Sequence, residues 1–453
     1  MSESAAPAVR VARGATYIYV QGVASYLITV VYFAFATRIL SVAEIGVIAS
    51  LAMISSFFTT FGTLAIPSAA TKYVSEFIGR DRPRLAKGVF KKSLYFGFIA
   101  SIISSLACFA VSYIISVFVF ESEANRFLVS ILALDVFALV LLTFFSGVLA
   151  GLQKFKEVSA INVVINLVRS GSALFLILRG YGILGVVSGW IAGDFTGLIL
   201  HSFFSLTSFK NGSESFPFSR LAKYSLPLYA SGAVGYLSTY VDRFLILFYA
   251  GFANLGIYNV AMVASGAVGL VSNAIGSALF PQLSERYGKA GLAALKDASF
   301  RASRYVSLVY VPLAVGLAVT ALPTITLFAG VQYMEGAALL AVFSISMALT
   351  ALSIIVNSVL SSLAKTRILL EVNSLAVFVD TLLCLILLPY FGVVGAAFGR
   401  AASTIVFFAY CDRRLKSIHK FRYDGEAFKK SWLGSIVMGL IVLVLEVVWM
   451  DRL

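Results

Sequence analysis

The sequence predicts an all-α, polytopic membrane protein, and three observations support this fold class. Apolar residues make up 60% of the 453 positions and charged residues only 12%, with a mean hydropathy of +0.94. A soluble domain has roughly a quarter of its residues charged. Apolar runs of about 20 residues recur along the whole chain, each long enough to cross the hydrocarbon core as a helix. Such runs are too long for barrel strands, so we expect a helical bundle in lipid.

We expect about thirteen membrane spans, with boundaries uncertain by a few residues. The expected spans are residues 15–37, 45–66, 93–119, 127–151, 158–178, 183–208, 224–250, 255–280, 305–328, 337–360, 368–389, 392–410 and 432–450.

The net charge of +14 is distributed very unevenly over the loops. Of the 35 Lys and Arg residues, 28 lie at the N-terminus or in loops of the same parity, and four lie on the opposite side. This bias predicts that the basic loops and the N-terminus are cytoplasmic. The basic excess then faces anionic inner-leaflet lipid, and we do not expect the protein to bind nucleic acid.

The chain matches itself at an offset of 210 residues, which indicates an internal repeat. The matched residues are Tyr26, Leu27 and Thr29 with Tyr236, Leu237 and Thr239, Gly46 with Gly256, and Gly182 and Gly185 with Gly392 and Gly395. After a shift of one further residue, Leu149, Lys154 and Asn162 match Leu360, Lys365 and Asn373.

A repeat with an even number of spans places both copies in the same orientation, as parallel repeats. We therefore predict a six-helix lobe at residues 1–210, a second at 211–420, and one additional C-terminal helix within 421–453. A polar, turn-rich linker at residues 210–217 joins the lobes. Two lobes around a cavity that opens alternately to either side are typical of a transporter.

Enzyme signatures are missing from the loops. The sequence has no GxxxxGK[ST] loop, no HExxH helix, no paired Cys/His cluster and no GxSxG elbow. We expect no enzyme activity, no catalytic residues, no metal site and no cofactor.

Seven charged residues fall well inside the expected spans. A charge at the bilayer centre costs about 3 kcal/mol, so all seven facing lipid would cost about 20 kcal/mol. They must face protein or water, either as interhelical ion pairs or as the lining of a transport cavity. The seven are Asp135, Arg169, Asp194, Asp242, Arg243, Asp380 and Arg400.

Polar residues at helical spacing form stripes on several spans. Such stripes can pack helices together or line a site, and the sequence leaves both interpretations open. The fifth span carries Ser159, Asn162, Asn166 and Arg169, and the tenth carries Ser346, Thr350, Ser353 and Asn357.

The charged residues suggest two kinds of role. A guanidinium group binds phosphate bidentately, so Arg169, which has no acidic neighbour one turn away, suits a phosphorylated solute. Four carboxylates are candidates for proton or sodium coupling, with a structural counter-ion role as the alternative; they are Asp135, Asp194, Asp242 and Asp380. Adjacent Asp242 and Arg243 point about 100° apart on a helix and cannot face one partner.

Three segments carry a family resemblance. The run Arg38–Gly46 resembles the R-x-L-[ST]-x-x-[ED]-[YF]-G signature of polysaccharide transporters. Asp242–Ile246 followed by Leu255–Ala261 resembles their D-[RK]-x-x-[IL]…LGxYxxA segment, and Gly392–Ala397 is similar to their G-x-x-G-A-A segment. The chain thus resembles the oligosaccharide flippase (Wzx-like) family of the multidrug/oligosaccharidyl-lipid/polysaccharide superfamily over about residues 10–415.

The resemblance implies transport of polyprenyl-diphosphate-linked oligosaccharide from the inner to the outer leaflet, by alternating access, in the cytoplasmic membrane. It implies that Arg169, Arg243 and Arg400 contact diphosphate or acidic sugar, and that Asp242 is the acidic position of the seventh span. Asn162, Asn166 and Asn357 complete the substrate-cavity candidates. Other glycan-assembly membrane proteins are candidate partners, together with membrane lipids.

Two alternatives remain open at this point. The protein could be a cation-coupled exporter of drugs or metabolites from the same superfamily, which would favour an acidic cavity without several buried arginines. It could also be a non-transport membrane component of glycan synthesis.

Overall fold

The predicted spans are helices in the computed structural model, which describes residues 5–120, 126–209, 212–363 and 365–450. These residues contain helices and no strands. The chain forms two compact units, Met1–Tyr236 and Leu237–Leu453. The division falls within a helix, downstream of the predicted linker, whose residues 210 and 211 lie outside the described residues.

The number of crossings agrees with the sequence. Among the described residues, ten helical segments are long and apolar enough to cross a membrane, or eleven with one bent pair of helices. Two segments, Phe218–Gly276 and Arg367–Ser417, contain 59 and 51 residues, where about 20 suffice for one crossing. Each is interrupted by a glycine with non-helical backbone, Gly251 and Gly392. Counting the bent pair as one crossing and each of these two long segments as two gives thirteen crossings within the described residues.

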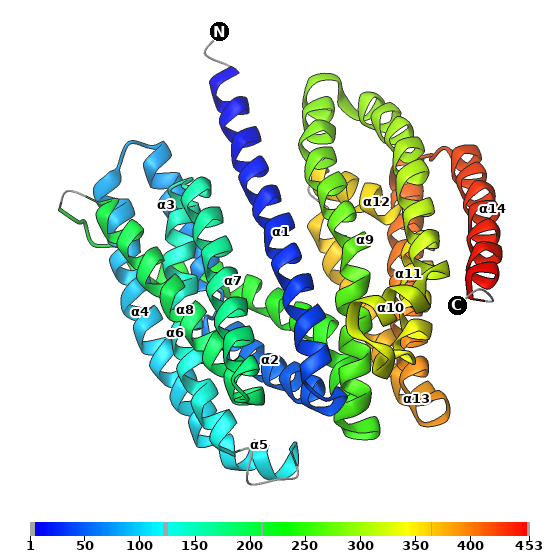
Figure 1. The fold of residues 1–453 in the computed structure, drawn as a ribbon. Coiled ribbons are helices and arrows are strands. Elements are labelled where there is room, and N and C mark those ends of the chain that lie inside the picture. Colours follow the sequence, from blue (N-terminus) through cyan, green and yellow to red (C-terminus); the bar gives the residue numbers. More distant parts are fainter. Residues whose placement is uncertain (1–4, 121–125, 210–211, 364, 451–453) are drawn as a thin grey trace. The chain divides into compact units, whose positions relative to one another are not determined.

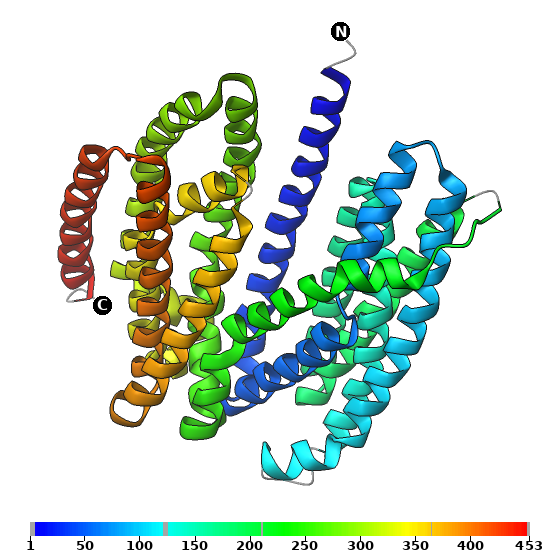
Figure 2. The ribbon, with the colours of Figure 1, turned by 180° about the vertical axis from the view of Figure 1, so that it is seen from behind.

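The first unit is built around one helix that is apolar on every side. Helix α6 packs against α3, α4 and α8, and α7 packs against both α8 and α1 (Figures 1 and 2). A helix that is apolar nearly all round is either buried in protein or faces lipid, and α6 buries most of its large side chains. The elements are α1 (Ala5–Ile39), α2 (Val42–Gly62), α3 (Ile66–Gly79), α4 (Pro83–Ala110), α5 (Ser112–Phe118), α6 (Arg126–Gly151), α7 (Phe155–Leu178) and α8 (Gly182–Thr207).

The start of α2 gives the first resemblance motif a structural meaning. The Glu44 backbone N–H donates to the Ser41 hydroxyl at 3.3 Å, and the Ser41 backbone N–H donates to the Glu44 carboxylate at 2.8 Å. This reciprocal capping box satisfies two backbone donors that a helix start leaves free. The serine and the acidic residue of the motif therefore begin the second span.

Glycines allow α8 to approach α7 closely. A Cβ atom added to Gly189 would lie 2.6 Å from the Ala173 backbone nitrogen, and one on Gly193 would lie 2.7 Å from the Arg169 Cβ. Small residues bring membrane helices into such contact. This close approach places Arg169 of α7 next to Asp194, the residue that follows Gly193 on α8.

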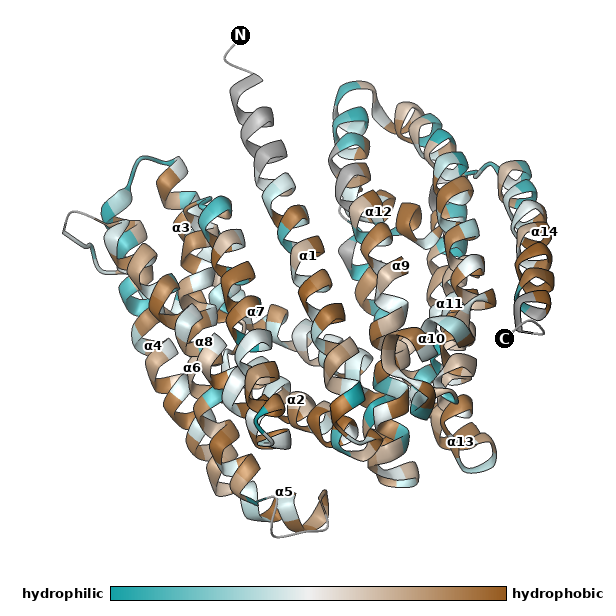
Figure 3. Cartoon of the chain, in the orientation of Figure 1, coloured by the Kyte–Doolittle hydropathy of each residue, from teal (hydrophilic) through white to brown (hydrophobic). Residues whose placement is uncertain are grey.

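The second unit contains several helices that bend or break. Helix α9 (Phe218–Val319), whose first residues belong to the first unit, has non-helical backbone at Gly251, Ala290 and Gly291. The remaining elements are α10 (Ala321–Ala329), the 3-10 turn η2 (Val331–Tyr333), α11 (Gly336–Leu349), α12 (Ser353–Ser362), α13 (Thr366–His419) and α14 (Gly425–Met450). In Figure 3 hydrophobic residues dominate the middle of these helices, as lipid exposure requires.

The tenth span is broken, which the sequence did not predict. Helices α11 and α12 meet at an angle of 51° between Leu349 and Ser353. Ser346 and Thr350 are buried and donate to backbone carbonyls of their own helix. The interpretation of Ser346, Thr350, Ser353 and Asn357 as one continuous stripe is therefore wrong, because the break separates the first pair from the second.

The additional C-terminal helix is present as α14, and its first turn is anchored. The Asp424 carboxylate accepts from the Ala427 backbone N–H at 2.9 Å and pairs with Arg304 of α9 at 2.8 Å. The Asp424 backbone N–H donates to the Ser303 hydroxyl at 2.8 Å. Beyond this anchor most of α14 presents exposed apolar side chains.

Candidate functional site

The first unit contains a cluster of charged residues contributed by α6, α7 and α8. A guanidinium nitrogen of Arg169 lies 3.3 Å from an oxygen of Asp194. The Asp194 side chain is 2% exposed, whereas that of Arg169 is 28% exposed. The guanidinium also lies 4.8 Å from the ring centre of Trp190, one helical turn before Asp194. An ion pair and a cation–π contact thus hold one arginine at the α7–α8 contact.

A second carboxyl group belongs to this cluster. Asp135 of α6 is fully buried, and one of its oxygens accepts from the Ser55 hydroxyl at 2.9 Å. Its other oxygen has no hydrogen-bond partner among the described residues. The charge of Asp135 acts on the Asp194 carboxyl, so the two carboxyl groups belong to one cluster.

The polar stripe of the fifth span faces α1. The Asn166 amide donates to the Ser25 hydroxyl of α1 at 3.1 Å and to the Asn162 backbone carbonyl at 2.8 Å. The charge of Arg169 acts on the buried Tyr32 hydroxyl of α1, which has no hydrogen-bond partner in the described part of the chain. Asn166 therefore joins two helices, and Arg169 lies at the end of the same interface.

The second unit has its own cluster of two carboxylates and one arginine. A guanidinium nitrogen of Arg400 lies 3.4 Å from Asp380 and 3.8 Å from Asp242, and it also donates to the Ser238 carbonyl. Asp242 and Asp380 are 0% and 2% exposed, and Arg400 is 24% exposed. One cation thus lies between two buried anions from different helical segments.

Two further side chains complete this cluster. The Tyr258 hydroxyl donates to Asp242 at 2.5 Å, and the Cys384 thiol donates to Asp380 at 3.6 Å. The sequence analysis assigned no role to either residue. Tyr258 could have been recognised from the sequence, because it is the tyrosine of the LGxYxxA segment. Cys384 could not, because nothing in the sequence distinguishes it from other small apolar residues of its span.

Arg243 does not belong to this cluster. Its guanidinium lies 5.2 Å from the Tyr240 ring, and its buried Nε has no hydrogen-bond partner in the part of the chain that the structure describes. No ion pair of Arg243 is found among those residues. The neighbouring Asp242 is fully buried with Tyr258 and Arg400. The two adjacent side chains have different surroundings, as their separation on a helix requires.

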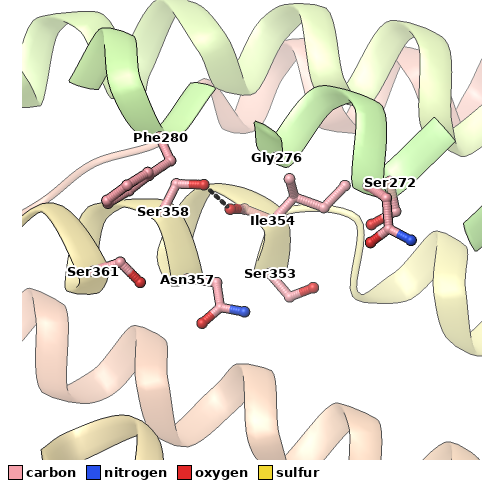
Figure 4. A pocket seen from close by; sticks show the side chains of 9 residues that line it. Ser272, Gly276, Phe280, Ser353, Ile354, Asn357, Ser358 and Ser361 are labelled. Atoms are coloured by element: carbon pink, nitrogen blue, oxygen red, sulfur yellow. Dashed lines mark hydrogen bonds between the residues drawn. The ribbon is translucent and has the colours of Figure 1, made fainter. Parts of the chain in front are cut away.

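A polar cavity of about 310 Å³ in the second unit is lined by residues of α9 and α12. Asn357 lines it, together with two residues that continue its face, Ser353 and Ser361. In Figure 4 these three side chains project from one side of α12, whereas Ile354 and Ser358 lie toward α9. The sequence analysis missed the α9 residues of the lining, which are Ser272, Asn273, Gly276 and Phe280.

The predicted residues are thus distributed over several places. Asp135, Arg169 and Asp194 meet in the first unit, and Asp242, Asp380 and Arg400 meet in the second. Asn162 and Asn166 lie at the α1–α7 interface, Asn357 lines the polar cavity, and Arg243 lies apart. Among the described residues, no group of three or more His, Cys, Asp or Glu side chains could hold a metal ion.

Several solved structures of membrane transporters have the same fold as this chain. The lipid II flippase MurJ in an inward closed conformation superposes with a TM-score of 0.72 at 16% identity, covering 95% of this chain and 92% of that one. An inward-facing multidrug resistance MATE family transporter of the MOP superfamily gives 0.70 at 13% identity, with coverages of 87% and 96%. A MOP superfamily transporter from Pyrococcus furiosus gives 0.63 at 14% identity, with coverages of 90% and 96%.

The chain therefore has the fold of the MOP superfamily transporters. The model of the polysaccharide biosynthesis protein family matches residues 35–338, about two thirds of the chain. The protein belongs to this family, and the resemblance predicted from three short motifs is confirmed at that level. No curated protein sequence matches the chain.

Proposed function

We propose that the protein is a flippase that moves polyprenyl-diphosphate-linked oligosaccharide from the inner to the outer leaflet of the cytoplasmic membrane. The product would supply polysaccharide or glycoconjugate assembly. Family membership supports a glycan substrate, and the fold supports alternating access between two lobes. The proposal includes transport and no enzymatic step.

The state of Arg243 is the observation that carries the diphosphate part of the proposal. Of the three arginines inside spans, Arg169 has one carboxylate partner and Arg400 has two. Arg243 has none among the described residues, and its Nε is buried without a partner. An unpaired cation at membrane depth costs several kcal/mol and is a functional candidate by default. A diphosphate fits it because a guanidinium binds phosphate oxygens bidentately.

The two charged clusters supply a candidate for the driving ion. Each contains two buried carboxylates and one arginine, so each carries an excess negative charge when all three groups are ionised. An uncompensated buried charge is costly, and uptake of H⁺ or Na⁺ removes it. We therefore assign ion coupling to Asp135 with Asp194, to Asp242 with Asp380, or to both pairs.

The same excess of negative charge also favours the alternative, a cation-coupled exporter of drugs or metabolites. Structural likeness to MATE transporters fits this alternative equally well. The two functions differ at Arg243, because a cationic drug would be repelled by an unpaired guanidinium. The drug susceptibility of the deletion strain should therefore be measured in the same experiment.

The test measures the leaflet distribution of lipid-linked oligosaccharide in a strain without the gene. We expect accumulation on the inner leaflet, rescue by the wild-type protein, no rescue by Arg243→Ala, and partial rescue by Arg243→Lys. Arg179→Ala, at an exposed helix end, is the matched control and should rescue fully. Normal outer-leaflet delivery in a deletion strain without paralogues would exclude the flippase, and a loss of drug resistance alone would favour the exporter.

A further inference from the structure

The break in the tenth span creates a site that the charged clusters do not use. Helix α12 is buried at Ile354, Ile355, Val356, Ser358, Val359 and Leu360, yet Asn357 in the middle of this run is exposed. Irregular backbone at membrane depth is tolerated where it is covered by protein or lines a water-filled cavity. The exposed Asn357 lines the polar cavity formed by residues of α9 and α12.

The lining of this cavity is polar but carries no charged side chain. Its polar groups are four serine hydroxyls and two asparagine amides, from Ser272, Asn273, Ser353, Asn357, Ser358 and Ser361. Ser358 donates to the Ile354 carbonyl at 2.8 Å, and Ser272 is bonded to Tyr310. Within the described residues, no side-chain partner is found for Asn273, Ser353, Asn357 or Ser361. Four groups able to donate and accept are therefore free for a ligand.

We propose that this cavity binds a neutral sugar residue of the transported glycan, an inference that rests on the proposed function. A sugar hydroxyl both donates and accepts, and serine hydroxyls and asparagine amides offer both functions. Phe280 at the edge of the cavity offers an aromatic face for the apolar C–H face of a sugar ring. A volume of about 310 Å³ lies at the lower end of small-molecule pockets, which suits one or two sugar rings.

The lack of charge in the lining decides between neutral and acidic sugars. A carboxylate placed in this cavity would lose hydration without gaining a cationic partner from any lining residue. A neutral hexose or N-acetylhexosamine replaces its water contacts with the four free groups. The cavity therefore selects by hydrogen bonding, whereas Arg243 would recognise the phosphate part of the substrate by charge.

The first test measures direct binding to the purified, detergent-solubilised protein by ligand-observed NMR. The probes are glucose, galactose, N-acetylglucosamine and N-acetylgalactosamine, with glucuronate as the acidic comparison. A single sugar ring has few atoms, so we expect a Kd of about 1–10 mM for at least one neutral sugar. We expect Asn357→Leu to weaken that binding about tenfold or more, and Asn373→Leu, outside the lining, to leave it unchanged.

Three outcomes would overturn the proposal. These are no neutral sugar bound at about 50 mM, glucuronate bound as well as the neutral sugars, or unaltered binding by Asn357→Leu. If Asn357→Leu fails to fold, Asn273→Ala and Ser353→Ala test the same lining from two different helices, and each should weaken binding.

A second experiment separates this inference from the proposed function. In the deletion strain, Asn357→Leu should leave lipid-linked oligosaccharide on the inner leaflet, as Arg243→Ala does. If the deletion itself does not redistribute the lipid-linked oligosaccharide, the proposed function fails whatever the cavity binds. If Arg243→Ala blocks delivery while Asn357→Leu delivers normally and no neutral sugar binds, only the sugar site fails.

Discussion

The two units place an ion pair at the same helix–helix contact but with the charges exchanged. In the first unit the arginine is on α7 and its carboxylate partner on α8. In the second unit Asp380 lies on α13 before the break at Gly392, and Arg400 lies after it. The two helical segments that follow the fourth span of each unit therefore carry opposite charges in the two units.

The contacts between these segments are otherwise equivalent. Gly189 approaches Ala173 in the first unit, and Gly399 approaches the Cys384 sulfur in the second. Gly185 packs on Leu176, and Gly395 packs on Leu387. These pairs differ by 210 or 211 residues, the two offsets of the sequence repeat. At the same offsets Arg169 corresponds to Asp380, and Trp190 corresponds to Arg400.

Both units thus place an ion pair between these segments, with the polarity reversed. The clusters nevertheless differ in how their charges are shared. Arg400 lies between two carboxylates, whereas Arg169 touches one carboxylate and the second lies beside the first. Loss of the arginine should therefore affect the two units unequally.

The largest effect is expected for Arg400→Ala. It leaves Asp242 and Asp380 buried without a cation, a loss that typically costs about 3–5 kcal/mol. Arg169→Ala should cost less, because Arg169 contacts one carboxylate whereas Arg400 lies between two. Thermal unfolding of both variants in detergent compares them, and Arg400→Ala with Asp380→Asn should recover part of the loss. Equal losses for both arginines would contradict the difference between the clusters.

An exchange of charges in the first unit should be tolerated better than either single change. Arg169→Asp and Asp194→Arg each place like charges together, whereas the double variant recreates the polarity of the second unit. We expect a coupling free energy of about 1–3 kcal/mol in a double-mutant cycle. The cycle is measured by thermal unfolding of the four proteins. Additive losses would show that the two sites are not interchangeable.

The hydroxyl groups of the two buried tyrosines, Tyr258 and Tyr32, should contribute differently to the stability of the protein. Tyr258→Phe removes the donor to Asp242 and should destabilise by about 1–2 kcal/mol. Tyr32→Phe should be nearly neutral, because its hydroxyl has no hydrogen-bond partner among the described residues. The two substitutions are matched in size and chemistry, so unfolding midpoints compare them directly. A larger loss of stability for Tyr32→Phe than for Tyr258→Phe would contradict this prediction.

The smallest effect concerns the anchor at the start of α14. The Ala427 backbone N–H and Arg304 lower the pKa of Asp424 below its ordinary value of 3.8. The anchor is therefore fully formed above pH 3.8 and is lost as the pH falls through the lower folded value. Hydrogen exchange should show faster opening of the first turn of α14 in acid, and Asp424→Asn should show it already at neutral pH. Equal protection in both proteins would exclude the anchor.

Much of the fold could be predicted because lipid imposes simple rules. Apolar runs marked the spans, and the distribution of Lys and Arg predicts an orientation. The break between Leu349 and Ser353 could not be predicted. Ser346, Thr350, Ser353 and Asn357 have the spacing of one continuous helix, and no proline or glycine marks the interruption.

The sites were predictable as residue types but not as partnerships. A charge inside a span is easy to recognise because its burial is costly, so all six charged members of the two clusters were found, whereas Tyr258 and Cys384 were not. Which carboxylate pairs with which arginine depends on tertiary packing between residues up to 158 positions apart, Asp242 and Arg400. The unpaired state of Arg243 and the isolation of exposed Asn357 on a buried helix were likewise visible only in three dimensions.

The separation of the paired charges along the chain also bears on how the protein is made. Asp194 follows Arg169 by 25 residues and Arg400 follows Asp380 by 20, so each pair lies in one hairpin. A hairpin that leaves the translocon as a unit brings each charge into the bilayer with its partner. Among the described residues, Asp242 has no ion-pair partner within its own hairpin. It can pair with Arg400 only after the helical segment that contains Arg400 has been synthesised. Until then the donors to this carboxylate are the Tyr258 hydroxyl, 16 residues further on, and the backbone N–H of Arg243.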